Sequence, residues 1–299
     1  MKLLFAFCTV CYSAAMSETP PVVLTIAGFD PCSGAGITAD IKTIAAHGCY
    51  GVACITALTV QSTAGVRRVE TVDSSLISET LEEIYSDLPI AAVHIGMLGS
   101  AQIVQTIINF LYRVKPKTVV LDPILKSSSG ADLLNEEGAK LLVQKMLPMV
   151  DVVTPNTSEA AVLSGCEVAT PEQMKQAART LQELGAKAVV VTGGDLEKAI
   201  DLLSFTTGRG IEQEVFKSER QKSKSTHGTG CAFATAIACH LAMGRGLPEA
   251  VLLAKAYVTA AIVHGQPLGR GTGPLHHLYR MTQTQPQRRV VYAEQEGVH

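Results

Sequence analysis

The sequence has no tryptophan, and only 5% of its 299 residues are aromatic. It also lacks an excess of charge of either sign, because 25 lysines and arginines stand against 27 aspartates and glutamates, a formal net charge of −2. Proteins that bind nucleic acids or anionic membranes rely on basic surfaces, and binding of single strands also uses aromatic stacking platforms. The composition therefore predicts neither a nucleic acid nor a membrane as a partner.

The eight cysteines show no regular spacing and mostly stand among apolar residues, at positions 8, 11, 32, 49, 54, 166, 231 and 239. Cys8 and Cys11 form a CxxC pair without a second pair of ligands, so we predict no zinc site there. The neighbours His276 and His277 point apart on regular structure and have no nearby Cys or carboxylate partner, so we predict no metal site there either. Reduced thiols in a cytoplasmic protein explain the cysteines better than disulfides do.

From residue 22 onward, short apolar runs alternate with amphipathic segments. Strands are predicted at 22–27, 52–57, 91–95, 118–121, 150–154 and 188–192, and helices at 35–47, 74–86, 101–112, 135–146, 171–184, 230–243 and 248–264. Residues 202–216 are predicted to form a hairpin that turns at 208–210. The alternation predicts an α/β fold with a mainly parallel central sheet and helices on both faces, whose ligands bind at the carboxyl ends of the strands.

The most informative motif is the run from Ser225 to Cys231, which opens a long apolar helix. Glycine and small residues expose backbone N–H groups at a helix N-terminus, and this arrangement binds anions such as phosphate. Cys231 falls in the first helical turn, where the helix dipole favours the thiolate. A thiolate there could accept a proton from a substrate hydroxyl that attacks a phosphate. The alternative is a glycine-rich turn followed by a buried structural cysteine.

A second glycine-rich segment, residues 28–40, joins a predicted strand to a helix. It matches neither the GxGxxG pattern nor the P-loop, so an ordinary strand-to-helix turn explains it equally well. Asp40 lies in the helix that follows, where a carboxylate more often faces solvent than binds a ligand.

Asn156 follows a predicted strand, and Glu159 comes three residues later, a spacing typical of a helix capping box. The same spacing places an amide and a carboxylate on one helical face, where they can hold hydrated Mg²⁺ and its phosphates. Asp122, at the end of a neighbouring strand, could add a second acid. Residues 192–194 end another strand with two glycines that allow a nucleotide to approach the backbone, although such turns are common.

Together these segments resemble the hydroxymethylpyrimidine/phosphomethylpyrimidine kinases of thiamine biosynthesis, in the ribokinase-like superfamily. The resemblance covers about residues 22–279 and is carried by 24–28, 30–31, 33–37, 39–40, 55–58, 61, 95–98, 122–123, 154–156, 159–160, 227–231 and 273–277. It implies a ribokinase-like three-layer fold. It also implies an enzyme that uses ATP and Mg²⁺ to phosphorylate 4-amino-5-hydroxymethyl-2-methylpyrimidine and then its monophosphate. Because this fold often dimerises, we also expect a homodimer.

The resemblance further implies roles for individual residues. The residues expected to contact the pyrimidine are Gln61, Gly28, Asp40 and Met97. Those expected to bind ATP and its phosphates are Asn156, Thr192, Gly194 and Lys255. The acids expected at Mg²⁺ are Glu159 and Asp122. Gly228, Thr229 and Gly230 would form an anion hole beside Cys231, which would act as the base at the position where most ribokinase-like enzymes carry aspartate.

Two other functions compete with this one. Some pyridoxal kinases of the same superfamily share the Gly-Thr-Gly-Cys run, and a non-catalytic ligand-binding protein could have the same fold. Gln61 favours the pyrimidine, because a side-chain amide can pair with an aminopyrimidine edge. The intact set of Cys231, Asn156, Glu159 and the glycines argues against a degenerate site.

We find no linker that divides the chain, so we predict one domain at residues 19–280, an extension at 1–18 and a polar tail at 281–299. The extension contains Lys2, an apolar run at 3–12 and Ser13-Ala14-Ala15, which resembles a short secretory signal. The alternative is an over-extended reading frame with Met16 as the working start. We favour the alternative, because the implied chemistry requires cytosolic ATP.

Overall fold

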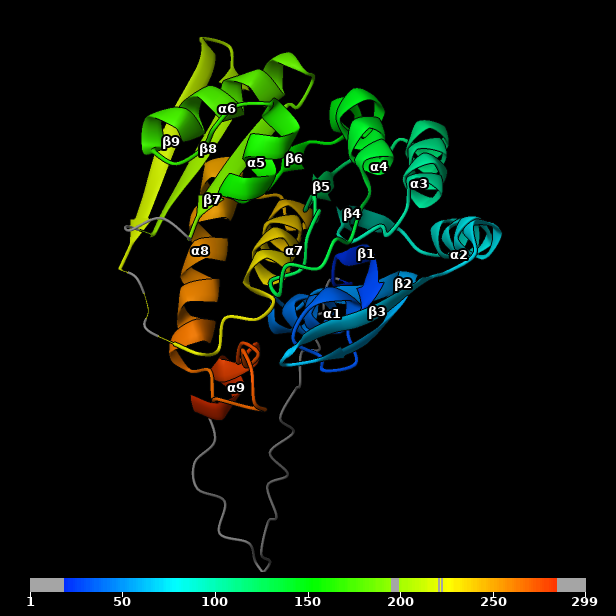
Figure 1. Cartoon of the computed structure of the whole chain (residues 1–299). Coiled ribbons are helices and arrows are strands. Elements are labelled where there is room, and N and C mark those ends of the chain that lie inside the picture. Colours follow the sequence, from blue (N-terminus) through cyan, green and yellow to red (C-terminus); the bar gives the residue numbers. More distant parts are fainter. Residues whose placement is uncertain (1–18, 195–198, 220, 222, 284–299) are drawn as a thin grey trace, which may run out of the picture.

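The computed structural model describes residues 19–194, 199–219, 221 and 223–283. Within these ranges, nine strands form one sheet in the order β3-β2-β1-β4-β5-β6-β7-β8-β9 (Figure 1). The strands are β1 (Val22–Phe29), β2 (Tyr50–Ser62), β3 (Gly65–Thr71), β4 (Ile90–Ile95), β5 (Val119–Leu121), β6 (Val152–Val153), β7 (Ala188–Gly193), β8 (Ala199–Thr207) and β9 (Gly210–Ser218). The predicted extension at 1–18 lies outside the described residues.

The centre of the sheet, from β2 to β7, is parallel, and both edges are antiparallel. The predicted hairpin forms the edge made by β8 and β9. The other edge, β3, was not predicted. Its apolar residues Val66 and Val69 stand three positions apart with two arginines between them, so the period of two that marks a half-buried strand is missing.

Helices cover both faces of the sheet, as predicted. One face carries α2 (Ser74–Asp87), α3 (Ala101–Val114), α4 (Glu136–Leu141), α5 (Thr157–Ser164) and α6 (Pro171–Glu183). The other carries α1 (Gly36–Ala46), α7 (Thr229–Ala242), α8 (Leu247–Val263) and the short α9 (Tyr279–Gln283). A separate hydrophobic core lies on each face of the sheet. Neighbouring residues of β1 point to opposite faces, so Val23 belongs to the core that contains α7 and Leu24 to the core that contains α3. These layers confirm the predicted three-layer α/β fold.

Two predicted boundaries differ from the structure. The helix predicted at 135–146 is α-helical only to Leu141, and a π-helical turn at Leu142–Met146 continues it. The predicted polar tail begins at residue 281, yet Met281 still belongs to α9.

α7 lies against β1, β4 and β5 and between α1 and α8 (Figure 1). Every residue from Cys231 to His240 is buried. A helix that is apolar on all sides is stable only inside a protein, so the sequence of α7 places it there. The N-terminus of α7 points at the carboxyl ends of the central strands.

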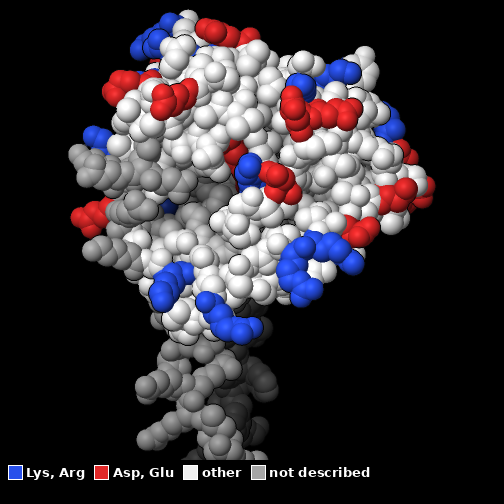
Figure 2. Space-filling model, viewed as in Figure 1, with Lys and Arg blue, Asp and Glu red and all other residues white. Residues whose placement is uncertain are grey.

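The surface shows no single-sign field on the face in Figure 2, where acidic and basic side chains are interspersed with broad uncharged areas. None of the helices in the described ranges is both long and apolar enough to cross a membrane.

Candidate active site

Two glycine-rich loops meet at the carboxyl edge of the sheet, one between β1 and α1 and the other leading into α7. Gly228 has a φ of +83°, and a Cβ on it would overlap the carbonyl oxygen of Gly34. Gly36 has a φ of +56°, and a Cβ on it would overlap the carbonyl oxygen of Gly28. Left-handed backbone suits glycine, and neither contact leaves space for a side chain. The contact between Gly228 and Gly34 therefore interlocks the two loops, and the contact between Gly36 and Gly28 closes the first loop on itself.

Asp30 anchors the first loop. Its carboxylate accepts hydrogen bonds from the N–H groups of Cys32 at 2.8 Å, Gly34 at 3.1 Å and Ala35 at 3.0 Å. One carboxylate oxygen also lies 2.9 Å from Nε2 of His227. Burial acts to raise the pKa of Asp30, but the hydrogen bonds from His227 and the loop outweigh burial and hold the pKa below its usual value. Asp30 is therefore ionised at neutral pH.

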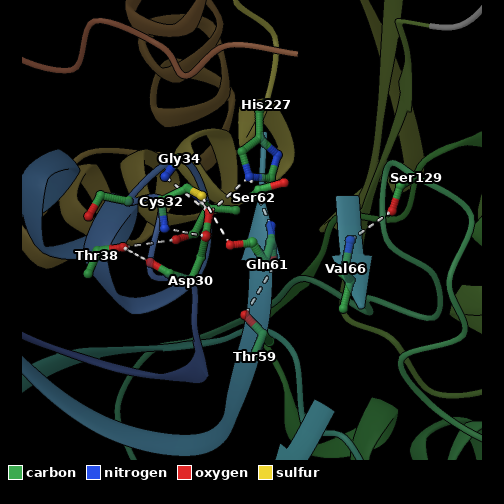
Figure 3. A network of polar contacts seen from close by, with 12 residues as sticks. Asp30, Cys32, Gly34, Thr38, Thr59, Gln61, Ser62, Val66, Ser129 and His227 are labelled. Carbon is green, nitrogen blue, oxygen red and sulfur yellow. Dashed lines mark hydrogen bonds and ion pairs between the residues drawn. The ribbon is translucent and has the colours of Figure 1, made fainter. Parts of the chain in front are cut away.

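Gln61, the predicted pyrimidine contact near the end of β2, is joined to both loops (Figure 3). Its Nε2 lies 3.1 Å from Nε2 of His227, and its Oε1 lies 3.2 Å from Oγ1 of Thr59. The thiol of Cys32 donates a hydrogen bond to its main-chain carbonyl oxygen at 3.4 Å. The structure therefore brings Gln61 to the loop that begins at Gly28.

Gly28 and Met97, two further predicted pyrimidine contacts, lie against each other. A Cβ on Gly28 would stand 2.9 Å from Sδ of Met97. Met97 is buried, and its carbonyl oxygen accepts a hydrogen bond from Oγ1 of Thr56 at 2.6 Å. A Cβ there would force the flexible side chain of Met97 to shift, so the glycine lets Met97 pack against the loop in its present position.

Asp40, the fourth predicted pyrimidine contact, is fully buried among protein groups. It accepts hydrogen bonds from Oγ1 of Thr25 at 2.7 Å and Oγ1 of Thr235 at 2.9 Å. Nδ1 of His94 lies 3.5 Å from the same carboxylate. The solvated helix face that the sequence suggested for Asp40 is therefore wrong.

Cys231 lies in the first turn of α7, whose N-cap is Gly228. Its thiol is buried and lies close to the N–H of Gly36, in the first loop. Burial and the negative charges of Asp122, Asp40 and Glu159 together raise the pKa of Cys231 well above its usual value. The sequence predicted that the helix dipole would favour the thiolate. Desolvation and three nearby acids outweigh the dipole, so the resting group is a thiol.

Asp122 follows β5 and lies close enough to Cys231 for its charge to act on the thiol. Burial raises the pKa of Asp122 well above its usual value, and the charges of Glu159 and Asp40 raise it further. The end of β5 and the start of α7 thus share one buried acidic patch.

Asp122 and Glu159 fit Mg²⁺ by their chemistry. They are only 5% and 7% exposed and close enough for one charge to act on the other. Carboxylate oxygens are the ligands that Mg²⁺ prefers, and a cation beside them would relieve their repulsion. Within the described ranges, no group of three or more His, Cys, Asp and Glu side chains forms a metal site. Two carboxylates suit an ion that keeps several waters and binds phosphate oxygens.

Asn156 and Glu159 form the predicted capping box of α5. The side chain of Asn156 accepts from the N–H of Glu159, and the side chain of Glu159 accepts from the N–H of Asn156, both at 2.9 Å. An isolated bridge pairs Asn156 with Thr192, whose N–H donates to the carbonyl oxygen of Pro155 at 2.9 Å. The structure therefore gathers three of the predicted phosphate and metal residues at the ends of β6 and β7.

Lys255 approaches the same edge from α8. Its Nζ lies 2.6 Å from Oδ2 of Asp201, and Oδ1 of Asp201 accepts a hydrogen bond from the N–H of Gly193 at 3.2 Å. Lys255 also lines a mostly apolar groove of about 480 Å³ between α8 and β9, with Leu252, Val263 and Lys217 among its other residues. Gly194, by contrast, has no atom within 4 Å of the place where a Cβ would stand.

Two residues of the site gained no role from the sequence. His227 belongs to the motif from Ser225 to Cys231, but no role was predicted for it. Its position directly before Gly228 could have indicated that it lies in the site. Asp201 stands in β8 with no motif around it, and only the folded structure brings it to Lys255.

The chain matches the sequence model of a protein family described as phosphomethylpyrimidine kinase, over residues 30–276. The hydroxymethylpyrimidine/phosphomethylpyrimidine kinase of Haemophilus influenzae is 40% identical, over 85% of this chain and 96% of the relative. The thiamine biosynthesis bifunctional protein of Geobacter sulfurreducens is 42% identical over 86% of this chain, which spans only 52% of that longer protein.

Solved structures agree with the fold. A pyridoxal kinase of Bacillus subtilis in complex with ADP has a TM-score of 0.80 at 33% identity, covering 88% of this chain and 99% of its own. A phosphomethylpyrimidine kinase of Clostridium difficile has a TM-score of 0.72 at 38% identity, covering 81% of this chain and 99% of its own. The chain belongs to the phosphomethylpyrimidine kinase family and has the ribokinase-like fold.

Proposed function

We propose that this chain is a kinase of thiamine biosynthesis, which uses ATP to phosphorylate 4-amino-5-hydroxymethyl-2-methylpyrimidine and then its monophosphate. Relatives named hydroxymethylpyrimidine/phosphomethylpyrimidine kinase are 37–40% identical to this chain over 84–86% of its length. The observation that carries the proposal is the position of Cys231. Its buried thiol stands in the first turn of α7, beside the first glycine-rich loop and close to the carboxyl group of Asp122.

In the proposed pocket, the ring rests against Met97 and Gly28 and pairs with the amide of Gln61. Its hydroxymethyl group then points to Cys231. Deprotonated Cys231 removes the hydroxyl proton as the oxygen attacks the γ-phosphate, and the bond from the γ-phosphorus to the β-phosphate oxygen breaks to release ADP. A positioned base contributes about 10²–10⁴-fold to such a step. The first turn of α7 is proposed to face the transferred phosphate with the N–H of Gly230, because the helix dipole favours negative charge there. The N–H of Thr229 makes a long hydrogen bond of 3.4 Å to the carbonyl oxygen of Thr226, which a phosphate would have to replace. In the second phosphorylation the attacking phosphate oxygen is already deprotonated, so the base matters less.

Mg²⁺ is the proposed metal, held by Asp122 and Glu159. When bound, it neutralises charge on the phosphates during transfer. Its positive charge would offset the acids that raise the pKa of Cys231 and so favour the thiolate, which proton removal requires.

ATP is proposed to bind across Asn156, Thr192, Gly194 and Lys255. Lys255 supplies a positive charge for the phosphates, and the apolar groove beside it, between α8 and β9, suits the flat face of a base. Structures of the pyridoxal kinase of Staphylococcus aureus, with TM-scores of 0.77 and 0.78, were solved with AMP-PCP and with ADP. These relatives support ATP as the phosphate donor.

Pyridoxal phosphorylation is the second candidate function, because a pyridoxal kinase has a TM-score of 0.80 with this chain. The two functions separate in one assay. ADP release by the purified chain is measured with MgATP and either the hydroxymethylpyrimidine or pyridoxal, and products are identified by mass spectrometry. We expect turnover with the pyrimidine and a diphosphate product. Turnover with pyridoxal alone would contradict the proposed substrate, and no turnover with either would support the non-catalytic alternative.

We also propose a cytoplasmic homodimer. Three apolar side chains of β2, Tyr50, Leu58 and Val60, are 55%, 49% and 44% exposed, and exposed apolar groups on one strand favour association. Light scattering on the purified chain distinguishes a monomer from a dimer by mass. A monomer mass at micromolar concentration would contradict the proposed dimer.

A further inference from the structure

His227 places one ring nitrogen between two polar groups (Figure 3). Its Nε2 lies 2.9 Å from Oδ2 of Asp30 and 3.1 Å from the amide of Gln61. An imidazole nitrogen either donates or accepts a hydrogen bond, and does not do both. Asp30 is an ionised carboxylate, which only accepts. Nε2 of His227 therefore carries a proton and donates it to Asp30.

A protonated Nε2 has no lone pair to accept the amide N–H of Gln61, so the amide has to turn its oxygen toward the ring, where the oxygen shares the single hydrogen with Asp30. The oxygen and nitrogen ends of an amide are distinguished by the hydrogen bonds around them. With the amide turned by half a rotation, its oxygen faces the N–H of His227 and its NH₂ group faces Oγ1 of Thr59. Oγ1 of Thr59 donates its own hydrogen to the carbonyl oxygen of Phe29 at 3.0 Å, so it can accept from Gln61. Every donor in this chain of contacts then has an acceptor.

The backbone holds both partners in place. A Cβ on Gly34 would overlap the ring of His227, and the main-chain N–H of His227 donates to the carbonyl oxygen of Gly273 at 3.0 Å. On the other side, β2 and β3 shift register at Gln61, because Val60 pairs with Arg68 whereas Gln61 pairs with Val66. Bulges of this kind re-aim side chains beside active sites.

We propose that Asp30 and His227 are positioning residues. They hold the Gln61 side-chain amide in one orientation, with its oxygen toward His227, and thereby select the substrate ring. The amide keeps one N–H and one oxygen lone pair for the substrate. That pair complements a ring nitrogen next to an exocyclic amino group, the edge that an aminopyrimidine presents. A free amide could turn to match the opposite order, whereas the held amide cannot. The inference rests on the proposed function and names its specificity device.

The first test compares two substitutions of His227. His227→Leu removes the donor, and His227→Gln keeps an N–H near the position of Nε2. We expect His227→Leu to raise the KM for the pyrimidine about tenfold, the size of one lost buried hydrogen bond, and to change the KM for ATP less than about twofold. His227→Gln should restore most of the loss. Equal increases for both substrates, or no rescue by glutamine, would overturn the proposal.

A double substitution tests whether His227 acts through Gln61. In a Gln61→Ala background, His227→Leu should add less than about twofold to the pyrimidine KM, since coupled residues are not additive. Multiplying effects would show independent roles and overturn the proposal. Ser62→Ala is the matched control, because Ser62 follows Gln61 on β2, is exposed and points to the other face of the strand.

A third measurement does not depend on turnover. Nitrogen NMR of the full chain with ¹⁵N-labelled histidine reports which ring nitrogen of His227 is protonated, and the signal is assigned by its loss in His227→Gln. A protonated Nε2 supports the proposal, and an unprotonated Nε2 overturns it. If the chain fails to phosphorylate the pyrimidine, the proposed function is contradicted. The NMR measurement still tests whether Nε2 of His227 donates to Asp30.

Discussion

The pyrimidine side and the nucleotide side of the site are held in opposite ways. On the pyrimidine side, Gly34 and Gly228 interlock, and Asp30 gathers three N–H groups and a histidine around one carboxylate. On the nucleotide side, a Cβ on Gly194 would meet none of the described atoms within 4 Å, and Lys255 borders a groove of about 480 Å³. The loops on the pyrimidine side are fixed by these contacts before any ligand binds. The groove on the nucleotide side has room to adapt to its ligand.

This difference follows from what each side must do. A small ring makes few contacts, and its hydroxyl must meet the base within a few tenths of an ångström, which requires a rigid pocket. A nucleotide has phosphates, a sugar and a base, so many weaker contacts can hold it. Substitutions on the packed side should therefore cost more than those on the open side.

Gly228→Ala should have the largest effect. A left-handed alanine alone costs about 1–3 kcal/mol, and the overlap with Gly34 adds to that cost. We expect kcat/KM to fall by more than about 100-fold with either substrate varied, together with a lower melting temperature. Steady-state kinetics and thermal unfolding check both. An alanine variant with normal activity would show that the loops are not interlocked in solution.

Cys231→Ala should come next, with a fall of about 10²-fold in the rate of the first phosphorylation and a smaller fall in the second. The raised pKa of Cys231 adds a pH signature. A base works deprotonated, so the first-step rate should rise as pH rises toward the pKa of the thiol, and the alanine variant should lose that rise. Single-turnover assays of each step provide the measurement. An unchanged first step would remove Cys231 from the role of base.

Lys255→Met should raise the KM for ATP about tenfold, since a charged hydrogen bond is worth about 1.5–3 kcal/mol, and should leave the KM for the pyrimidine unchanged. Asp201→Asn is the matched variant, because it keeps the shape of the partner at 2.6 Å while removing its charge. Separate titrations of the two substrates check the split. If the pyrimidine KM rose equally, the two sides would not be independent.

Gly194→Ala should have the smallest effect, a rise of a few-fold in the KM for ATP, because a methyl group would stand where the nucleotide is proposed to approach the backbone, while the KM for the pyrimidine should change less than about twofold. Its backbone is not left-handed, and a Cβ there would meet no atom within 4 Å. It is also the direct control for Gly228→Ala. A loss above tenfold would mean that the nucleotide side closes tightly around its ligand.

The fold was predictable because its signals are local. Buried parallel strands such as 22–27 and 188–192 appear as short apolar runs, and a helix as apolar as 230–243 has to lie inside the protein. Glycine clusters at strand ends marked the two loops for the same reason. β3 was missed because an exposed edge strand with Arg67 and Arg68 carries little hydrophobic pattern.

The chemical state of the site was not predictable, because it depends on residues far apart in the sequence. The pKa of Cys231 is set by burial and by acids at positions 122, 40 and 159, and no local pattern announces their approach. The place of Asp40 was hidden likewise, since its partners Thr25 and Thr235 lie 15 and 195 positions away. Local sequence predicts where chains turn, and distant contacts decide which groups ionise.

The contact between Asp30 and His227 spans 197 positions of the sequence, and the one between Thr43 and His277 spans 234. Contacts this distant close late, because each needs the intervening chain to be ordered first. On the ribosome, the strands and helices before α7 can already pack while the second glycine-rich loop is still unmade. The N-terminus of α7 and the thiol therefore join the first loop only after residues 225–231 have been made. A growing chain can thus form much of its sheet before the phosphate site is complete.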